Sequence, residues 1–248
     1  MGNIRHWLSI SMTRRADFRG VLLKSLSLAI LCTLFTAPYF HHLLSVSFKT
    51  QDRFLMHSDF HAVLIMELSL LFITCLLSAI VGFSYSKKFH LPGFGDLRRF
   101  TETIPLLLLV GVVMGGLTYL IFDRHFFYIS PASYPKDILY LVSCPFKVAF
   151  TNEVILRFCM VTLGVGILKN RLGGVILVSI FASILTMKYF RFLDLDYPFN
   201  YFFITQFFIS FFGNFILGYL FVTRGLIYSM SLHFLFGTRL AFVVWMLG

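Results

Sequence analysis

The chain alternates between long runs of apolar residues and short polar connections. The apolar runs cover residues 21–40, 61–84, 104–122, 137–168, 172–188, 199–222 and 225–247. A helix needs about 20 apolar residues to cross the ~30 Å hydrocarbon core of a bilayer. The pattern therefore predicts an all-α, polytopic integral membrane bundle of about seven to eight transmembrane helices.

The run over 137–168 accounts for the uncertainty in that number. It is too long for one perpendicular helix, and it contains Pro145. The pattern fits one tilted, kinked helix, or a short re-entrant or interfacial piece followed by a full span. Two complete crossings would have only about 16 residues each, which is below the usual length of a transmembrane helix.

Composition excludes a soluble protein and a nucleic-acid binder. Of the 248 residues, 58% are hydrophobic and only 13% are charged, and the mean hydropathy is +0.84. The net charge of +10 comes mainly from basic residues between the apolar runs, which is typical of an orientation signal and of contact with anionic lipid headgroups. The four cysteines form no CxxC pair, so no zinc ribbon is predicted. We expect a single membrane domain over 1–248, with the lipid bilayer as its main partner.

The distribution of Lys and Arg predicts a cytoplasmic N-terminus, because basic residues are more frequent in cytoplasmic connections. The N-terminal segment and the connections on its side of the membrane carry Arg5, Arg14, Arg15, Arg19, Lys87, Lys88, Arg98, Arg99, Lys169, Arg171 and Arg224. The opposite side carries fewer, namely Lys49, Arg53, Arg124, Lys136, Lys188 and Arg191.

The most specific stretch is TNEVILRF, residues 151–158, because it places two opposite charges inside an apolar run. Glu153 and Arg157 are four residues apart and fall on the same helix face. An ionisable residue in a span is costly and usually faces a partner or a watery cavity. Taken alone, the two residues indicate a buried structural ion pair. The other ionisable residues inside predicted spans are Glu67, Lys147, His233 and Arg239.

With its surroundings, this stretch resembles a known family. TNEVILRFCMVTLGVGIL is similar to the EExxxR motif of the CPBP intramembrane proteases, the group that contains CAAX prenyl endopeptidases and bacteriocin-processing membrane proteins. GNFILGYLFVTRGLIYSMSLHFLFG, residues 213–237, resembles the family's region that ends in HxxxN or HxxxD. GGVILVSIFASIL, residues 173–185, falls where the family carries FxxxH. The resemblance covers a CPBP-like core over 137–247, while the spans within 1–136 match nothing and have no assigned role.

The resemblance implies an all-helical core in which a glutamate, two histidines and an Asn or Asp hold a metal and an activated water. Such a site cleaves peptides near or within the membrane. The residue types suit that chemistry, because zinc takes about three protein ligands and a carboxylate must accept a proton from the attacking water. By resemblance, Glu153 is the candidate catalytic carboxylate, Arg157 its ion-pair partner and His233 a candidate zinc ligand.

Three family positions are occupied by residues that cannot do this chemistry. Asn152 stands in place of the first glutamate of EExxxR, Leu185 in place of the FxxxH histidine, and Gly237 in place of the terminal Asn or Asp. An amide is no general base, and leucine binds no metal. Glu153 and His233 alone are too few ligands for a zinc site unless another residue, such as Glu67, joins them.

Three functions remain open from the sequence. The first is a catalytically impaired relative that acts as a binding, scaffolding or regulatory subunit beside other membrane proteins, with no cofactor. The second is an active zinc peptidase with a rearranged site and a peptide or protein substrate. The third is a transporter subunit in which the ionisable residues line a polar path.

Overall fold

The computed structural model describes residues 2–49, 59–129, 134, 136–192 and 201–248, and the regular elements within them are all helices. They are α1 (Gly2–Lys49), α2 (Phe60–Ser86), α3 (Phe100–Thr118), η1 (Tyr119–Asp123), α4 (Arg124–Ile129), α5 (Ile138–Lys147), η3 (Val148–Val161), α6 (Thr162–Leu168), α7 (Arg171–Phe192), α8 (Tyr201–Arg224), α9 (Leu226–Gly237) and α10 (Arg239–Leu247). The predicted all-α fold is confirmed.

Six helical stretches of the described chain are long and apolar enough to cross a membrane. They are Phe18–Val46, Phe60–Ser86, Phe100–Ile129, Ile138–Leu168, Phe203–Arg224 and Leu226–Leu247. The predicted run 172–188 corresponds to a shorter apolar helix, Arg171–Met187. The protein is therefore a multi-pass membrane protein, with six of the predicted spans present as candidates and the crossing by α7 still a prediction.

The run over 137–168 forms one continuous helix, Ile138–Leu168. This agrees with the single-helix alternative and not with a separate re-entrant piece or with two complete crossings. The chain does not break at Pro145. Instead, three residues later, the backbone changes from α-helical to π-helical hydrogen bonding over Val148–Val161, where each amide bonds one residue further back.

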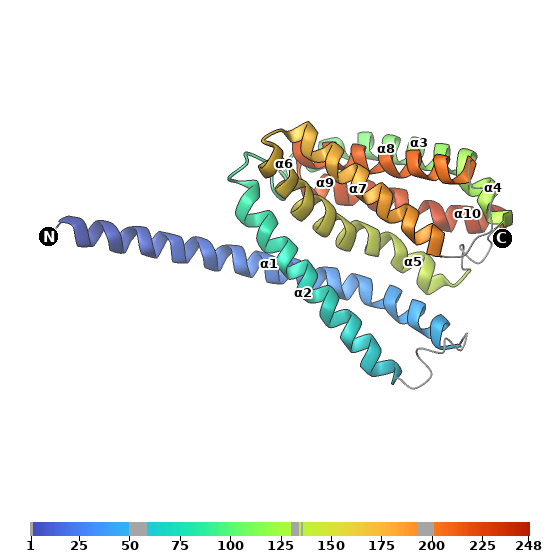
Figure 1. The fold of residues 1–248 in the computed structure, drawn as a ribbon, viewed down its shortest axis with the longest axis horizontal. Helices are drawn as coiled ribbons and strands as arrows, with labels where there is room; N and C mark the ends of the chain where they lie inside the picture. The colour runs from blue at the N-terminus through green and yellow to red at the C-terminus, as the bar shows by residue number, and fades with distance from the viewer. Residues whose placement is uncertain (1, 50–58, 130–133, 135, 193–200) are drawn as a thin grey trace.

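The three basic connections of the predicted cytoplasmic side meet at one end of the bundle. The Arg171 guanidinium donates to the carbonyl of His90 at 2.5 Å, which joins the α6–α7 and α2–α3 connections. The α8–α9 connection joins them at Gly225, whose φ of 111° only glycine adopts readily and whose missing Cβ leaves room for the backbone of Gly95. Since α7 begins and α8 ends here, the chain must travel to the far end and back through these two helices (Figure 1).

This grouping fits the predicted orientation but does not test it, so the cytoplasmic N-terminus stays a prediction. Part of the orientation signal cannot be compared with the structure. Arg53 lies outside the described residues, as do the first two residues of the run 199–222 and the side chains of Arg5, Arg14, Arg15, Lys49, Lys188 and Arg191.

The central packing unit is η3, which lies among α1, α2, α7, α8 and α9 (Figure 1). Phe158 of η3 is fully buried and stacks edge-on against Phe83 of α2, with ring centroids 4.7 Å apart. Its ring occupies the space that a Cβ on Gly82 would need, so the glycine lets α2 approach closely. The segment with the internal charges is thus also the segment with the most neighbours.

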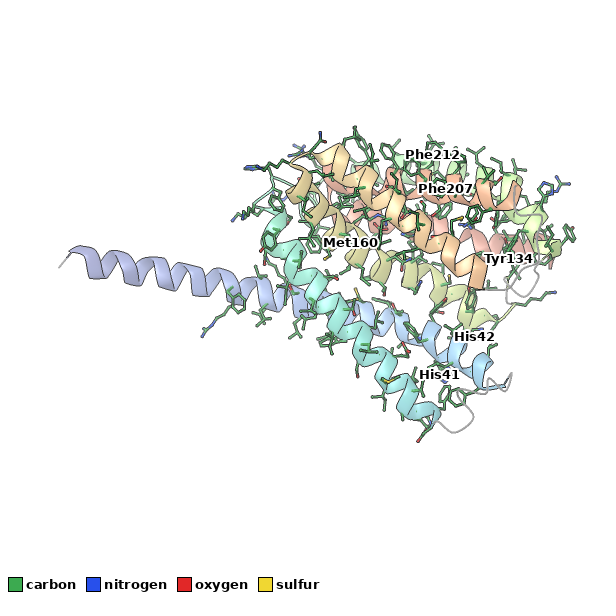
Figure 2. All side chains as sticks on the ribbon, viewed as in Figure 1. His41, His42, Tyr134, Met160, Phe207 and Phe212 are labelled. Carbon is green, nitrogen blue, oxygen red and sulfur yellow. The ribbon has the colours of Figure 1, made fainter. Side chains whose placement is uncertain are left out.

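The outer faces of the helices are apolar. Exposed fractions reach 72% at Val112 of α3 and 55% at Phe212 of α8, and Figure 2 labels Phe207 and Phe212 close together on α8. Exposed apolar side chains in such numbers would be unfavourable in water but suit a hydrocarbon environment. These faces make the lipid bilayer the natural surroundings of the bundle.

Close approach of α6 and α7 predicts a glycine-specific effect. A Cβ on Gly174 would lie 2.6 Å from the backbone nitrogen of Val165, whereas a Cβ on Gly116 of α3 would meet nothing within 4 Å. We expect Gly174→Ala to lower the free energy of unfolding by about 1–3 kcal/mol through overpacking. Gly116→Ala, the control, should leave it unchanged or slightly raised, because alanine favours helix. Denaturant unfolding in detergent micelles measures both, and equal effects would contradict the packing argument.

Candidate functional site

Glu153 and Arg157 lie on η3 at the centre of the bundle, where their side chains are 0% and 1% exposed. The Arg157 Nε lies 3.5 Å from the Glu153 Oε1, so the predicted ion pair is present but long. A π-helical segment is wider than an α-helix, and such segments are frequent at functional sites. Burial of both charges is expensive, and the pair needs additional hydrogen bonds to offset it.

His233 supplies one of these bonds from α9. Its Nδ1–H donates to the Glu153 Oε1 at 2.6 Å, which brings together residues 80 positions apart in the sequence. The carboxylate therefore selects the imidazole tautomer, and in neutral His233 the other ring nitrogen carries the lone pair. His233 keeps 14% of its side chain exposed, so its ring is the less enclosed partner.

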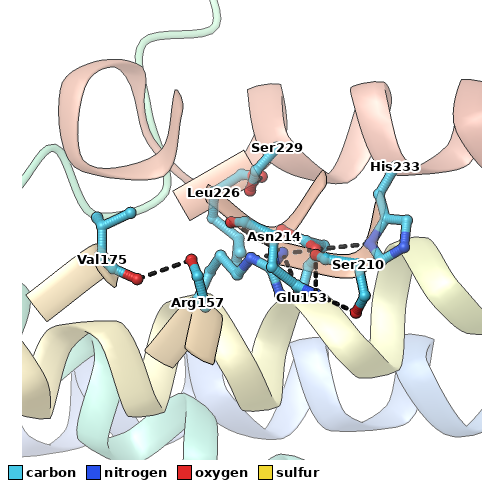
Figure 3. A network of polar contacts seen from close by, with 9 residues as sticks. Glu153, Arg157, Val175, Ser210, Asn214, Leu226, Ser229 and His233 are labelled. Carbon is cyan, nitrogen blue, oxygen red and sulfur yellow. Dashed lines mark hydrogen bonds and ion pairs between the residues drawn. The ribbon is translucent and has the colours of Figure 1, made fainter. Parts of the chain in front are cut away.

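Asn214 of α8 supplies the second bond. Its Oδ1 accepts from the Arg157 Nη2 at 2.7 Å, and its Nδ2 donates to the Ser210 carbonyl at 2.8 Å (Figure 3). Ser210 in turn donates to the Thr186 hydroxyl of α7 at 3.3 Å. One polar network thus links four helical segments, η3, α7, α8 and α9, each of which belongs to a different pass along the bundle.

Beside this network lies a cavity of about 380 Å³, which falls in the range of small-molecule sites. Asn152, Leu185 and His233 all contribute to its wall, together with Gln206 and Asn214. Glu153 and Arg157 are not among its lining residues. Of the two neighbouring residues Asn152 and Glu153, the uncharged Asn152 therefore faces the cavity, and the charged Glu153 is buried in the helix interface.

Of the six residues aligned by the resemblance, three thus line one cavity, and Glu153, Arg157 and Gly237 do not. Gly237 packs against α5, where a Cβ would lie 2.9 Å from the Cα of Pro145. Its role is close packing of α9 on α5. Glu67 lies on α2 and is not among the residues that line the cavity.

The donors at the site do not fit a zinc ion. Among the described residues, no group of three or more His, Cys, Asp or Glu side chains is close enough to hold a metal. Within the described part of the chain, the Oε2 of Glu153 has no hydrogen-bond partner, but its Oε1 is hydrogen-bonded to His233. With these two donors bonded to each other and only an amide and a leucine in the family's other positions, the expected ligand set is incomplete.

The other two ionisable residues singled out from the sequence have partners elsewhere. Arg239 reaches the cavity wall, yet its Nε donates to the buried Asp123 Oδ2 at 2.9 Å. The hydroxyl of Tyr134 donates to the other oxygen of Asp123 at 2.7 Å, and burial together with this carboxylate raises the pKa of Tyr134. Lys147 lies 5.5 Å from the centroid of the Tyr39 ring, a cation–π contact.

Sequence reasoning did not find Asn214, Ser210 or Thr186. A usable signal was present, because Ser210 and Asn214 are polar residues four apart in the run FFISFFGNFILGY. Two polar residues on one face of an apolar helix indicate a buried partner. Their partner, Arg157, could not be named from the sequence, since the contact joins residues 57 positions apart.

Comparisons with protein-family models, with curated proteins and with solved structures give no match to the chain. The resemblance to the CPBP family accordingly remains an expectation that rests on the quoted residues. What the structure adds is that three of them, Asn152, Leu185 and His233, line one cavity.

The buried network predicts a strong dependence of Arg157 on Glu153. Glu153→Leu should lower the free energy of unfolding by about 3–5 kcal/mol, because it leaves a buried guanidinium without its carboxylate. Adding Arg157→Leu should restore part of that loss, so the double variant is more stable than the sum of the single changes predicts. Denaturant unfolding in micelles gives the four values. Additive effects of the two substitutions would contradict the coupling.

Proposed function

We propose that the protein is a non-enzymatic member of the CPBP type, a membrane subunit that binds a ligand or partner in its polar cavity without cleaving it. The observation that carries this proposal is the different placement of two neighbouring residues of TNEVILRF, Asn152 and Glu153. Asn152 faces the cavity at the position where the family's catalytic carboxylate is expected, whereas Glu153 is enclosed and bonded to His233 and Arg157.

The chemistry of hydrolysis explains why the positions of Asn152 and Glu153 matter. A general base must lie within hydrogen-bond reach of the water that it deprotonates. The Asn152 amide can orient a bound group but takes no proton. Glu153 is the only carboxylate of the network, and its Oε1 already contacts both His233 and Arg157. In this proposal Glu153 and Arg157 hold the helices together and leave the cavity with neutral hydrogen-bonding groups.

The wall chemistry favours a neutral ligand. Amide groups of Asn152, Gln206 and Asn214 alternate with aliphatic side chains such as Leu185, and the nearby Arg239 charge is balanced by Asp123. Such a wall suits the uncharged, hydrogen-bonding backbone of a membrane polypeptide better than an ion. Another membrane protein is therefore the partner class that we propose.

One observation favours the active peptidase as the second candidate. A carboxylate holds one ring nitrogen of His233 while the residue itself lines the cavity. This arrangement is known to orient imidazoles that act as bases or as metal ligands. The peptidase would then use His233, not Glu153, as the group nearest to a substrate.

Photo-crosslinking distinguishes binding from cleavage. A photoreactive amino acid at Leu185, in the cavity wall, should capture an intact membrane polypeptide in native membranes. The control is Leu177 on the same helix, which has an exposed fraction of 48% against 46% for Leu185 but does not line the cavity. Mass spectrometry of the adducts then decides. Captured fragments with new termini, lost in His233→Asn, would overturn the binding proposal in favour of the peptidase.

Metal analysis supplies an independent test. After incubation with zinc and desalting, we expect the purified protein to hold far less than one zinc per chain, with no difference between the unmodified protein and His233→Asn. One zinc per chain that falls at least tenfold in folded His233→Asn, but not in the control His42→Asn, would contradict the proposal.

A further inference from the structure

Two further clefts lie on the other side of η3 and α9 from the cavity that Asn152 and His233 line. The first, of about 480 Å³, is bounded by α3, η3 and α9 and includes Leu108 in its wall. The second, of about 550 Å³, is bounded by α1, α2 and η3 and includes Lys24. Phe94, Phe150 and Met230 line both, so the two clefts adjoin at these residues, and together they are here called the α1–α3 groove.

The walls of the groove are almost wholly apolar. In its α3 half, the lining side chains are aliphatic or aromatic apart from Ser231, and Leu108 is 46% exposed. Where the two clefts adjoin, Phe150 stacks on Phe35 of α1 with ring centroids 4.7 Å apart. Helix α3 packs on α9, and α1 packs on α5 and η3, so the groove is left between the two outer helices. An apolar surface of this shape favours a hydrocarbon chain over a polar ligand.

Lys24 gives the groove a charged mouth. It is an exposed lysine inside the candidate span Phe18–Val46, and among the described residues no carboxylate lies within ion-pair distance of it. It lines the groove together with Phe83 and Phe94. Phe83 lies four residues before the exposed Lys87, so the mouth opens at the basic end of the bundle. This end attracts phosphate groups of an anionic membrane surface.

From these contacts we infer that the α1–α3 groove binds an anionic glycerophospholipid of the surrounding bilayer. The phosphate contacts Lys24, and one acyl chain runs past Met230 and Phe150 into the cleft between α3 and α9. The apolar wall supplies affinity for the chain and the lysine supplies preference for a negative headgroup. The site is separate from the polar cavity, and it does not depend on whether the protein binds or cleaves a peptide.

Native mass spectrometry of the full chain in a mild detergent tests the inference with defined lipids. Phosphatidylglycerol should occupy one site in preference to phosphatidylcholine with the same acyl chains. Lys24→Gln should lower the occupancy by phosphatidylglycerol about fivefold, the size expected for the loss of one cation near a membrane surface. Lys88→Gln, an exposed lysine of the same end that does not line the groove, is the matched control and should change it little.

A second pair of variants tests the acyl-chain part. Leu108→Trp should fill the cleft and reduce the binding of both lipids. Leu109→Trp, on the same helix but outside the lining residues, should not. Equal adducts of the two lipids that neither Lys24→Gln nor Leu108→Trp alters would indicate annular lipid only and overturn the inference. Equal losses of phosphatidylglycerol occupancy in Lys24→Gln and Lys88→Gln would also overturn the inference. A second copy of the chain that covers the groove, seen as a dimer in place of the lipid-bound monomer, would overturn it as well.

Discussion

The buried contact of Glu153 with Arg157 and His233 is the interaction on which the arrangement of the helical core depends. It joins η3 to α9 directly and, through Asn214, to α8. In a membrane, apolar packing alone distinguishes poorly between helix partners, because lipid tails are as apolar as the side chains. A charge that must find its counter-charge is far more selective, since any other arrangement leaves it unpaired in a medium of low dielectric constant.

That structural task limits what the same residues can do chemically. The Glu153 carboxylate pairs with Arg157, is fully buried and does not line the cavity. Catalytic sites tolerate unsatisfied polar groups when these groups face substrate. Here, among the described residues, the unpartnered atoms include Glu153 Oε2 and Arg157 Nη1, which are buried within the helix interface, and Gln206 Oε1, which belongs to a residue of the cavity wall. The Glu153–Arg157 pair therefore lies beside the cavity but contributes no side chain to its wall.

Much of this fold could be predicted from the sequence, and the parts that could not share a physical cause. A long apolar run indicates a helix surrounded by lipid, so the lengths of the runs predicted the membrane spans. The i, i+4 spacing of Glu153 and Arg157 likewise predicted their pairing. The change to π-helical geometry at Val148 and the contact of Arg157 with Asn214 have no local signal, because they arise from packing between distant segments. The facing direction of Asn152 depends on that same backbone geometry.

Helix α9 shows how two different surfaces arise from one apolar sequence. His233 and Phe236 face the polar cavity, whereas Met230 and Phe234 face the α1–α3 groove. The same division holds on η3, with Asn152 on the cavity side and Phe150 on the groove side. Two central helices thus separate a wall that mixes polar with apolar side chains from a wall that is almost wholly apolar. Because the buried ion network lies between these walls, it fixes the rotation of both helices, and this rotation decides which residues meet each surface.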